Sequence, residues 1–331
     1  MADVSADADD ISRGEPAPLV RIFGWSMLTL LVAFMVNNVL TVGLGFPGTR
    51  AAFVGGGGSA YFQLALYLAA IVIAALLVFS TGHRSLRGDA KVISDFNAFL
   101  IRGCFWAVLL VGIADAAIAF MRVERLLPLF FDQDLTQALG RARFVGPNIH
   151  IPLIALGFVI ALFTRTLGFT WLALMIVVAE LLIVISRFVF SYEQALMGDL
   201  VRYWYAALFL FASAYTLLDE GHVRVDVLYA GFSSRQRGIV NAIGAILLGL
   251  STSWVIIAIG FGGKQAIINS PVANFEISQT GSVGMFIKYQ MAAFLGVFAI
   301  TMLIQFVSYL FEAVADWRDE PGGREHTAPT H

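Results

Sequence analysis

Long apolar runs constrain the fold of this 331-residue chain more than any other feature of its sequence. A helix needs about 20 apolar residues to cross the hydrocarbon core of a bilayer. Because that core contains no water, each backbone group must also find its hydrogen-bond partner within the segment. Four uninterrupted runs of this kind occur, at about residues 23–46, 61–79, 239–261 and 289–311. They predict four membrane-spanning helices.

Four further apolar runs are interrupted or closely spaced, and we interpret each as a span. They lie at about residues 99–121, 149–163, 169–190 and 203–218. The stretch from 149 to 190 is too long for one crossing, and Arg165 and Gly168 provide a polar break and a residue suited to a turn. The sequence therefore predicts an all-α, polytopic membrane helix bundle with about eight transmembrane helices.

Composition excludes several other classes of protein. Hydrophobic residues make up 59% of the chain and charged residues 13%, and the mean hydropathy is +0.80, which is too high for a soluble domain of this length. The net charge of −2 leaves no basic excess for binding nucleic acid. A single cysteine, Cys104, excludes an intramolecular disulfide and a multi-cysteine metal cluster. The GGGGS stretch at 55–59 lacks the Lys and Ser/Thr that complete a phosphate loop.

The distribution of Lys and Arg predicts that both termini lie in the cytoplasm. In that orientation eleven basic residues lie on the inner side and six on the outer side. Four of the outer six fall in residues 122–148, where apolar clusters alternate with charges of both signs. Such a segment is typical of one that lies on a membrane surface or on a partner, with a partly ordered loop as the alternative.

Residues that could support catalysis are poorly placed. None of the five histidines falls in the middle of a predicted span, which argues against haem ligation across the bundle. The chain has no HExxH motif and no Gly-x-Ser-x-Gly elbow, and Asp115 has no second intramembrane aspartate to form a protease pair. The sequence therefore predicts a protein that is not an enzyme and that holds no cofactor or metal.

Three ionisable residues lie at membrane depth, where a charge is costly unless it faces protein or water. Asp115 lies between Gly112 and Ala116, a small-x-x-x-small spacing that allows another helix to approach, so we expect a buried carboxylate. Glu180 and Arg187 are two helical turns apart on one face, and we expect them at an interface. For Arg187 the alternative is that its side chain extends to lipid phosphate.

The most specific signal lies between residues 186 and 238. SRFVF at 186–190 ends a span, and GDLVRYWYAALFLFASAYTLLDEGHVRVDVLYAGFSSRQRG follows at 198–238. This pattern closely resembles the small membrane subunit, the DctQ-like subunit, of the tripartite ATP-independent periplasmic (TRAP) transporters. In that family an Arg-aromatic tail closes the first helix, an acidic residue and Arg-Tyr open the second, and a Gly-His-Ile/Val-Arg-Val-Asp motif closes it. The matching residues here are Arg187, Asp199, Arg202, Tyr203, Gly221, His222, Arg224 and Asp226.

The end of this pattern also has a physical interpretation. His222 and Asp226 are one helical turn apart, where a local hydrogen bond is possible. Arg224, Arg235 and Arg237 are interspersed with apolar residues, which predicts a basic amphipathic helix on the cytoplasmic membrane face, with a plain basic loop as the alternative. Nine residues are thus expected at a subunit or lipid interface: Glu180, Arg187, Asp199, Arg202, His222, Arg224, Asp226, Arg235 and Arg237.

The resemblance covers about residues 169–315 and implies four regions. An acidic cytoplasmic tail at 1–20 precedes a four-helix extension at 21–165, a DctQ-like four-helix domain at 166–315, and a second cytoplasmic tail at 316–331. The resemblance implies a small permease subunit in a bacterial inner membrane that scaffolds a large membrane subunit. A periplasmic binding protein would deliver an organic acid, and the large subunit would carry the sodium coupling.

Two other functions stay open on the sequence alone. An autonomous small transporter or channel would need converging polar groups at mid-depth, and the candidates are Asn37, Asn38, Asp115 and Glu180 on three helices. A membrane anchor for a redox enzyme is the second alternative, and the positions of the histidines disfavour its haem-bearing form.

Overall fold

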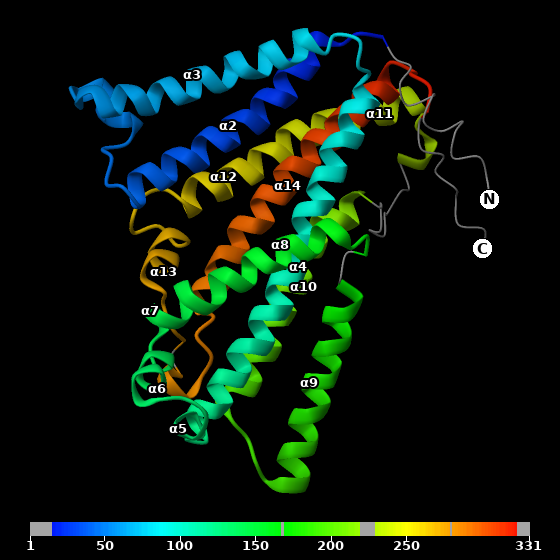
Figure 1. Ribbon diagram of the computed structural model, residues 1–331. Helices are drawn as coiled ribbons and strands as arrows, with labels where there is room; N and C mark the ends of the chain where they lie inside the picture. Colours follow the sequence, from blue (N-terminus) through cyan, green and yellow to red (C-terminus); the bar gives the residue numbers. More distant parts are fainter. Residues whose placement is uncertain (1–14, 167–168, 219–228, 279, 323–331) are drawn as a thin grey trace. The chain divides into compact units, whose positions relative to one another are not determined.

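The computed structural model describes residues 15–166, 169–218, 229–278 and 280–322 (Figure 1). All regular elements in these ranges are helical. Among these described residues, eight helical segments are long and apolar enough to cross a membrane. The predicted all-α membrane bundle with eight spans is confirmed.

Six of the candidate spans each correspond to one long α-helix, and the other two each contain a π-helical segment. The six are α2 (Pro18–Val42), α3 (Gly57–Ser80), α4 (Leu86–Val123), α9 (Phe169–Phe190), α10 (Ala195–Leu218) and α14 (Lys288–Trp317). The fourth span joins α7 (Ala142–Val145), the π-helix η2 (Gly146–His150) and α8 (Ile151–Phe163). The seventh joins α11 (Ser234–Gly244), the π-helix η4 (Ala245–Leu250) and α12 (Ser251–Gly260).

Short elements connect the spans. They are η1 (Thr49–Val54), α5 (Leu127–Phe130), α6 (Gln133–Leu139), η3 (Tyr229–Gly231), α13 (Asn269–Asn274) and η5 (Gly281–Val283).

Most spans begin earlier than the apolar runs predicted, and the differences are largest for α4 and α10. α4 starts at Leu86 instead of near residue 99, and α10 starts at Ala195 instead of near residue 203. With 38 residues, α4 is about 57 Å long at 1.5 Å per residue, well beyond the thickness of the hydrocarbon core. Its first turns contain Arg87 and Asp89, which are buried and paired within the protein. Charged residues therefore did not mark the end of this helix.

The chain forms two compact units, and each combines residues from both sides of the boundary predicted near residue 165. The first unit contains the chain up to Phe96, residues 217–255 and the chain from Met302. The second unit contains residues 97–216 and 256–301. α4 and α14 each contribute to both units. The boundary near residue 165 between the extension and the DctQ-like region stays a prediction.

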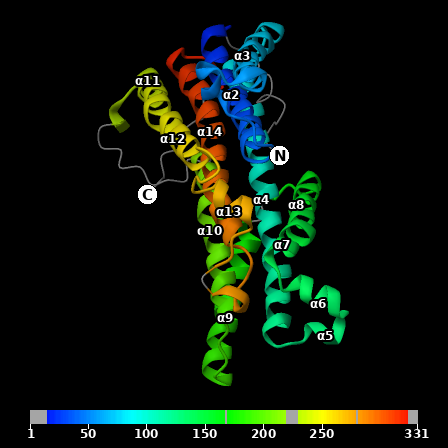
Figure 2. The ribbon, with the colours of Figure 1, turned by 90° about the vertical axis from the view of Figure 1, so that its left-hand side faces the viewer.

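Close helix packing in the first unit depends on small residues. α2 packs along α3, as Figures 1 and 2 both show. A Cβ atom on Gly24 of α2 would lie 2.4 Å from the ring of Phe311, and one on Gly238 of α11 would lie 2.4 Å from the backbone nitrogen of Trp317. The absence of a side chain at these two glycines thus allows α2 and α11 to approach α14.

Residues 122–148, in the second unit, fold into α5, α6 and α7 beside the C-terminal part of α4 (Figure 2). Asp132 caps α6, since its side chain accepts a 2.8 Å hydrogen bond from the backbone N–H of Leu135. The inner side of the segment belongs to a buried apolar cluster formed by Ile118, Leu127, Leu139, Val145 and Phe286. Leu129 and Phe130 are exposed, so the contact predicted for this segment with a membrane surface or partner stays a prediction.

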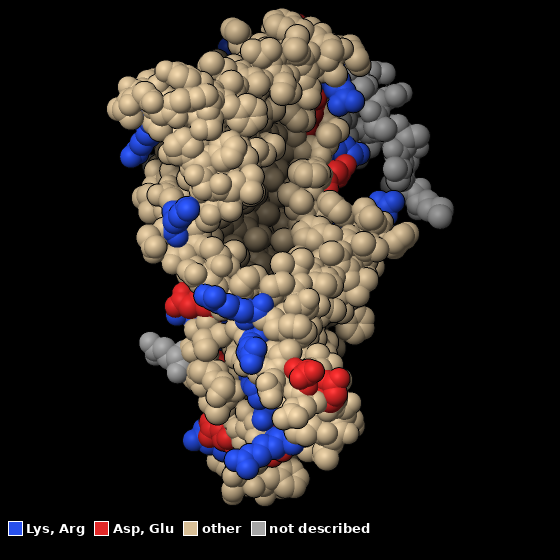
Figure 3. All heavy atoms as spheres, turned by 60° about the vertical axis from the view of Figure 1, so that its left-hand side comes forward, with Lys and Arg blue, Asp and Glu red and all other residues tan. Residues whose placement is uncertain are grey.

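The surface also fits a membrane protein. Most of the face drawn in Figure 3 is free of charged side chains, and Lys, Arg, Asp and Glu gather mainly in its lower part. Many large apolar side chains are exposed, among them Leu68, Leu76 and Phe79 on α3. An apolar surface of this extent is expected to face lipid or other membrane helices.

Candidate functional site

A buried polar network in the second unit begins at Asp115 of α4. Its Oδ2 atom accepts a 2.6 Å hydrogen bond from the backbone N–H of Phe286, and its Oδ1 atom lies 3.3 Å from Nε2 of His150. The contact with His150 is a close approach and not an aligned hydrogen bond. On the other side of the ring, Nδ1 of His150 lies 2.9 Å from the hydroxyl of Tyr289. Asp115 and His150 are fully buried, so both depend on these contacts.

The network continues along α14 to α10. Nε2 of Gln290 donates a 3.0 Å hydrogen bond to the Tyr289 hydroxyl, and the hydroxyl of Tyr203 donates to Oε1 of Gln290. Since the Tyr289 hydroxyl accepts from Gln290, its own proton is free to point at Nδ1 of His150. The other ring nitrogen, Nε2, faces Asp115. This arrangement connects four elements, α4, η2, α10 and α14, through a continuous set of polar side chains.

A second carboxylate holds the non-helical segment that precedes α14. Oδ2 of Asp199, on α10, accepts from the backbone N–H of Met285 at 3.1 Å and from the Thr280 hydroxyl at 3.2 Å. Arg202 lies 3.7 Å from the other oxygen of Asp199, with its own side chain largely exposed. Buried backbone amides need a partner. Asp199 accepts from the N–H of Met285, and Asp115 accepts from the N–H of Phe286. These two bonds explain how the non-helical residues Met285 and Phe286 can be buried here.

Arg122 fixes the same segment through its carbonyl groups. Its guanidinium donates to the carbonyl oxygens of Ser282, at 2.8 Å, and Gly284, at 2.5 Å. It also lies 4.0 Å from the centre of the Phe286 ring, a cation–π geometry. Residues of α4 and α10 therefore bind both backbone N–H groups and backbone carbonyl groups of the segment at 280–286.

A buried ion pair in the first unit links α2 to α4. Nε of Arg21 lies 2.8 Å from Oδ2 of Asp89, and both side chains are essentially inaccessible to solvent. The indole N–H of Trp25 donates to the same oxygen at 2.8 Å. Arg21 also donates to the carbonyl and the hydroxyl of Thr81, each at 2.8 Å. These bonds satisfy the guanidinium, as a buried ion pair requires for stability.

Arg87, two residues before Asp89, clamps the C-terminal end of α14. Its guanidinium lies 2.8 Å from Asp316 and 3.4 Å from Glu312. It also donates to the backbone carbonyls of Glu320 at 3.1 Å and Pro321 at 2.9 Å. The start of α4 is therefore bound to α2 by one buried charge and to α14 by another.

α9 presents its ionisable residues differently. Glu180 is exposed in the middle of the helix and makes no hydrogen bond or ion pair with any described residue. Nε of Arg187 lies 3.6 Å from Glu193, and both of these side chains are exposed. Of the eight candidate spans in the described ranges, α9 is the least buried.

Residues of the predicted basic segment fall into two groups. His222, Arg224 and Asp226 lie outside the described residues, so their expected place at an interface stays a prediction. Arg235 and Arg237 lie in the first turn of α11, which opens the seventh span. The place expected for these two residues at a lipid or subunit interface stays a prediction.

A capping box explains why the helix begins there. The Ser233 hydroxyl accepts from the backbone N–H of Gln236, and Oε1 of Gln236 accepts from the backbone N–H of Ser233. Arg237 lies one residue further, with its guanidinium 5.4 Å from the centre of the Tyr229 ring.

Residues 174–316 match the family model described as Tripartite ATP-independent periplasmic transporters, DctQ component. The chain therefore contains a DctQ domain. No curated protein and no solved structure matches the chain. The resemblance inferred from the sequence is confirmed, and the DctQ family is a family of transporter components and not of enzymes.

The match places most of α9, and all of α10 and α14 up to Asp316, in the DctQ domain. α2 to α8 precede it and form an N-terminal extension. The buried contacts described above therefore join the extension to the DctQ domain. In the second unit they run from Asp115, Arg122 and His150, and in the first from Arg87.

Sequence reasoning missed most residues of these networks, among them Arg21, Arg87, Asp89, His150 and Tyr289. The charges near α4 were interpreted as loop residues that set topology. A signal existed in the opposite charges of Arg87 and Asp89, which lie next to an apolar run and could have been read as buried partners. For His150, 35 positions after Asp115, the sequence offers no comparable signal.

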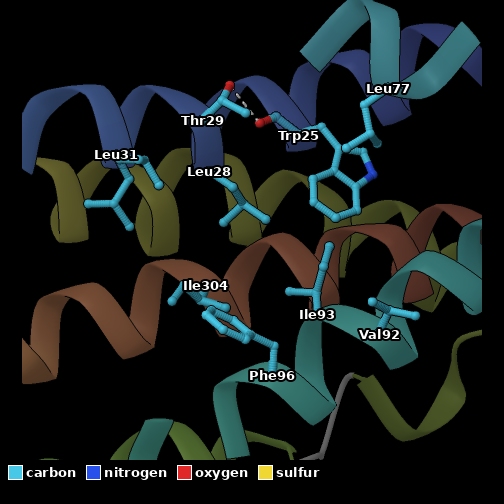
Figure 4. A pocket seen from close by; sticks show the side chains of 10 residues that line it. Trp25, Leu28, Thr29, Leu31, Leu77, Val92, Ile93, Phe96 and Ile304 are labelled. Carbon is cyan, nitrogen blue, oxygen red and sulfur yellow. Dashed lines mark hydrogen bonds between the residues drawn. The ribbon is translucent and has the colours of Figure 1, made fainter. Parts of the chain in front are cut away.

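An apolar groove lies in the first unit between α2, α3, α4 and α14 (Figure 4). It has a volume of about 340 Å³ and is lined by Trp25, Leu28, Thr29, Leu31, Val32, Leu77, Val92, Ile93, Phe96 and Ile304. The Thr29 hydroxyl donates to the carbonyl of Trp25, and the Trp25 indole donates to Asp89. A carboxylate ligand needs polar groups that fix its orientation, and this lining has none to spare.

Proposed function

We propose that the chain is the small permease subunit of a TRAP transporter and that it acts as a membrane scaffold for the large subunit. The observation that carries this proposal is the DctQ match over residues 174–316, within a chain of eight candidate spans. In this function the large subunit carries the substrate and sodium sites. A periplasmic binding protein captures an organic acid and delivers it.

The intramembrane polar groups support a scaffold over an autonomous transporter. A transporter must offer its ligand polar groups near the midplane and a segment that changes its exposure. Here Asn37 donates to the backbone carbonyl of Gln63 at 3.1 Å, and Asp115 accepts from the backbone N–H of Phe286. These groups are used by internal contacts, and those contacts hold helices together and do not line a path.

The proposed location is the bacterial inner membrane, with both termini in the cytoplasm. The even number of candidate spans, eight in the described ranges, supports a location of both ends on the same side. The side chain of Arg318 lies 3.3 Å from that of Glu15 in the first unit, which is in keeping with such an arrangement. The ratio of eleven to six basic residues then favours the cytoplasmic side.

Stepwise reconstitution tests the proposal. The chain is placed in liposomes with an inward sodium gradient, first alone, then with the large subunit, and finally with the binding protein added outside. Uptake of a radiolabelled organic acid is expected only in the complete mixture, because translocation by the large subunit requires both the scaffold and the binding protein that delivers the substrate. Vesicles with the large subunit and the binding protein, but without this chain, are the matched control.

Two results would contradict the proposal. Sodium-driven uptake by the isolated chain would favour the autonomous transporter. Full uptake in the control vesicles would show that the chain is dispensable. Labelling of cysteines introduced at Gly56 and Ser234 with an impermeant reagent, in the same vesicles, reports the orientation of the chain.

A further inference from the structure

α9 has one buried stripe and a large exposed surface. The buried positions are Leu172, Ile176 and Ala179, spaced four and three residues apart on one side of the helix. Glu180 lies next to this stripe, and Val177 and Val184 share its face. Both valines are about half exposed or more, at 63% and 48%. Between Val177 and Val184, the face that contains Glu180 is therefore apolar apart from this carboxylate, and Arg187 follows on the same face two turns after Glu180.

The position of Glu180 prevents it from reaching water along the helix. It is at least 10 residues from either end of α9, which corresponds to roughly 15 Å at 1.5 Å per residue. A glutamate side chain is much shorter than that. An ionised carboxylate facing acyl chains at this depth is costly, and charged residues inside spans almost always face a bundle interior or a water-filled cavity. No described residue of this chain provides such a partner.

A second copy of the chain does not provide one either. Two copies in one membrane insert in the same direction, so a twofold-symmetric pair would bring Glu180 towards Glu180. The basic residue of the same face, Arg187, is seven residues further along, at roughly 10 Å, and already lies beside Glu193. Like charges would repel and the opposite charges would not meet.

We infer that the α9 face formed by Val177, Glu180 and Val184 is the docking surface for a transmembrane helix of the large subunit. That helix carries an arginine, a lysine or another strong hydrogen-bond donor at the depth of Glu180. The inference rests on the proposed function for the identity of the partner chain. The chemistry of the partner follows from the carboxylate and from its apolar surroundings.

Site-specific photo-crosslinking tests the surface without removing the carboxylate. A benzophenone amino acid is placed at Val177 or Val184, and at Leu182 as the matched control. Leu182 is 55% exposed on the same helix but points about 160° away from Glu180. In membranes that contain both subunits, we expect adducts with the large subunit from positions 177 and 184 and not from 182.

Variants of Glu180 test the charge. Glu180→Leu is expected to lower the amount of large subunit recovered with the chain by about tenfold or more, because it leaves the partner's donor buried and unpaired. Glu180→Gln, which keeps a hydrogen-bond acceptor, is expected to lower recovery less. Glu193→Gln, a carboxylate exposed outside the span, is the control and should recover as much as the wild type. Thermal unfolding of each isolated variant shows whether it is folded.

The outcomes separate this inference from the proposed function. If the wild-type subunits co-purify but crosslinks from 177 and 184 reach only lipid or a second copy of this chain, the inference is wrong and the proposed function stands. Normal recovery of the large subunit with Glu180→Leu would overturn the charge pairing in the same way. If the wild-type chain recovers no large subunit and restores no uptake, the proposed function fails.

Discussion

α4 and α9 both carry ionisable residues within membrane-spanning helices, but they accommodate them in opposite ways. α4 contains Arg87, Asp89 and Asp115, and each is buried against a partner in the same chain. α9 contains Glu180 in an exposed position and without a partner among the described residues. The three buried charges of α4 thus have partners within the chain, whereas the exposed carboxylate of α9 has none among the described residues.

This difference suggests how the chain divides its contacts. The charges of α4 bind α2, α14 and the segment before α14, so the extension braces the DctQ domain from within the chain. The charge of α9 has no such contact among the described residues, and we infer that it pairs with a second protein. Substitutions in the isolated chain should separate the two cases, because only the internal contacts contribute to its stability.

The largest effect is expected for Asp89→Ala. This change leaves Arg21 buried without its counter-ion and Trp25 without an acceptor, and breaking a buried pair from one side costs about 3–5 kcal/mol. Thermal unfolding of the purified chain in detergent should show a large fall in Tm or a loss of folded protein. Lys91→Ala, on the exposed side of α4, should stay within about 0.5 kcal/mol of the wild type.

A double variant sharpens this prediction. Replacing Arg21 and Asp89 together by leucine removes both charges and should recover part of the lost stability, since apolar replacements of buried pairs are often neutral. If the Asp89→Ala protein unfolds at the same temperature as the wild type, the ion pair contributes little to the stability of the chain. The attachment of α4 to α2 would then not depend on this ion pair.

A smaller effect is expected for Asp115→Leu, and the same substitution at Glu180 is its direct counterpart. Asp115→Leu leaves the buried N–H of Phe286 without an acceptor, at a cost of about 1–3 kcal/mol. Glu180→Leu breaks no described contact and should change the stability of the isolated chain by less than about 0.5 kcal/mol. Equal losses of Tm for the two variants would remove the distinction between α4 and α9.

The sequence predicted the number of spans because that property depends on local composition. Each of the eight apolar runs overlaps a different one of the eight candidate spans in the described ranges. Helix starts were predicted less well where a charged residue is buried. At Arg87 and Asp89 the stop signal was a charge, but these charges are neutralised by residues 229 and 68 positions away. A count of local hydropathy does not contain that information.

The candidate site was predicted unevenly for a related reason. The motif from Arg187 to Asp226 identified the family, because motifs are local. It did not indicate that Asp199 binds the backbone of Met285, 86 positions later, or that His150 approaches Asp115. Those contacts depend on how distant helices pack, and a single sequence gives no direct measure of that packing.

The smallest effect is expected for Glu320, just beyond the C-terminal end of α14. Burial raises the pKa of this carboxyl above its ordinary value of 4.5, and nearby Glu15 adds to the rise, while Arg318 and Arg87 oppose it. The folded chain therefore binds this proton more tightly than the unfolded chain. Its contribution to stability is present below about pH 4.5 and is lost as the pH rises through the folded-state pKa.

Glu320→Gln should remove that dependence, because glutamine does not ionise. Between about pH 4.5 and neutrality, the Tm of the wild type should fall relative to the Tm of this variant, by an amount on the order of 1 °C. Asp319→Asn removes the same charge from an exposed neighbour and should leave the wild-type profile unchanged. A wild-type Tm that rises across this range relative to Glu320→Gln would mean that Arg318 and Arg87 outweigh burial. The end of α14 would then be held by its carboxylate as well as by the backbone carbonyls that Arg87 binds.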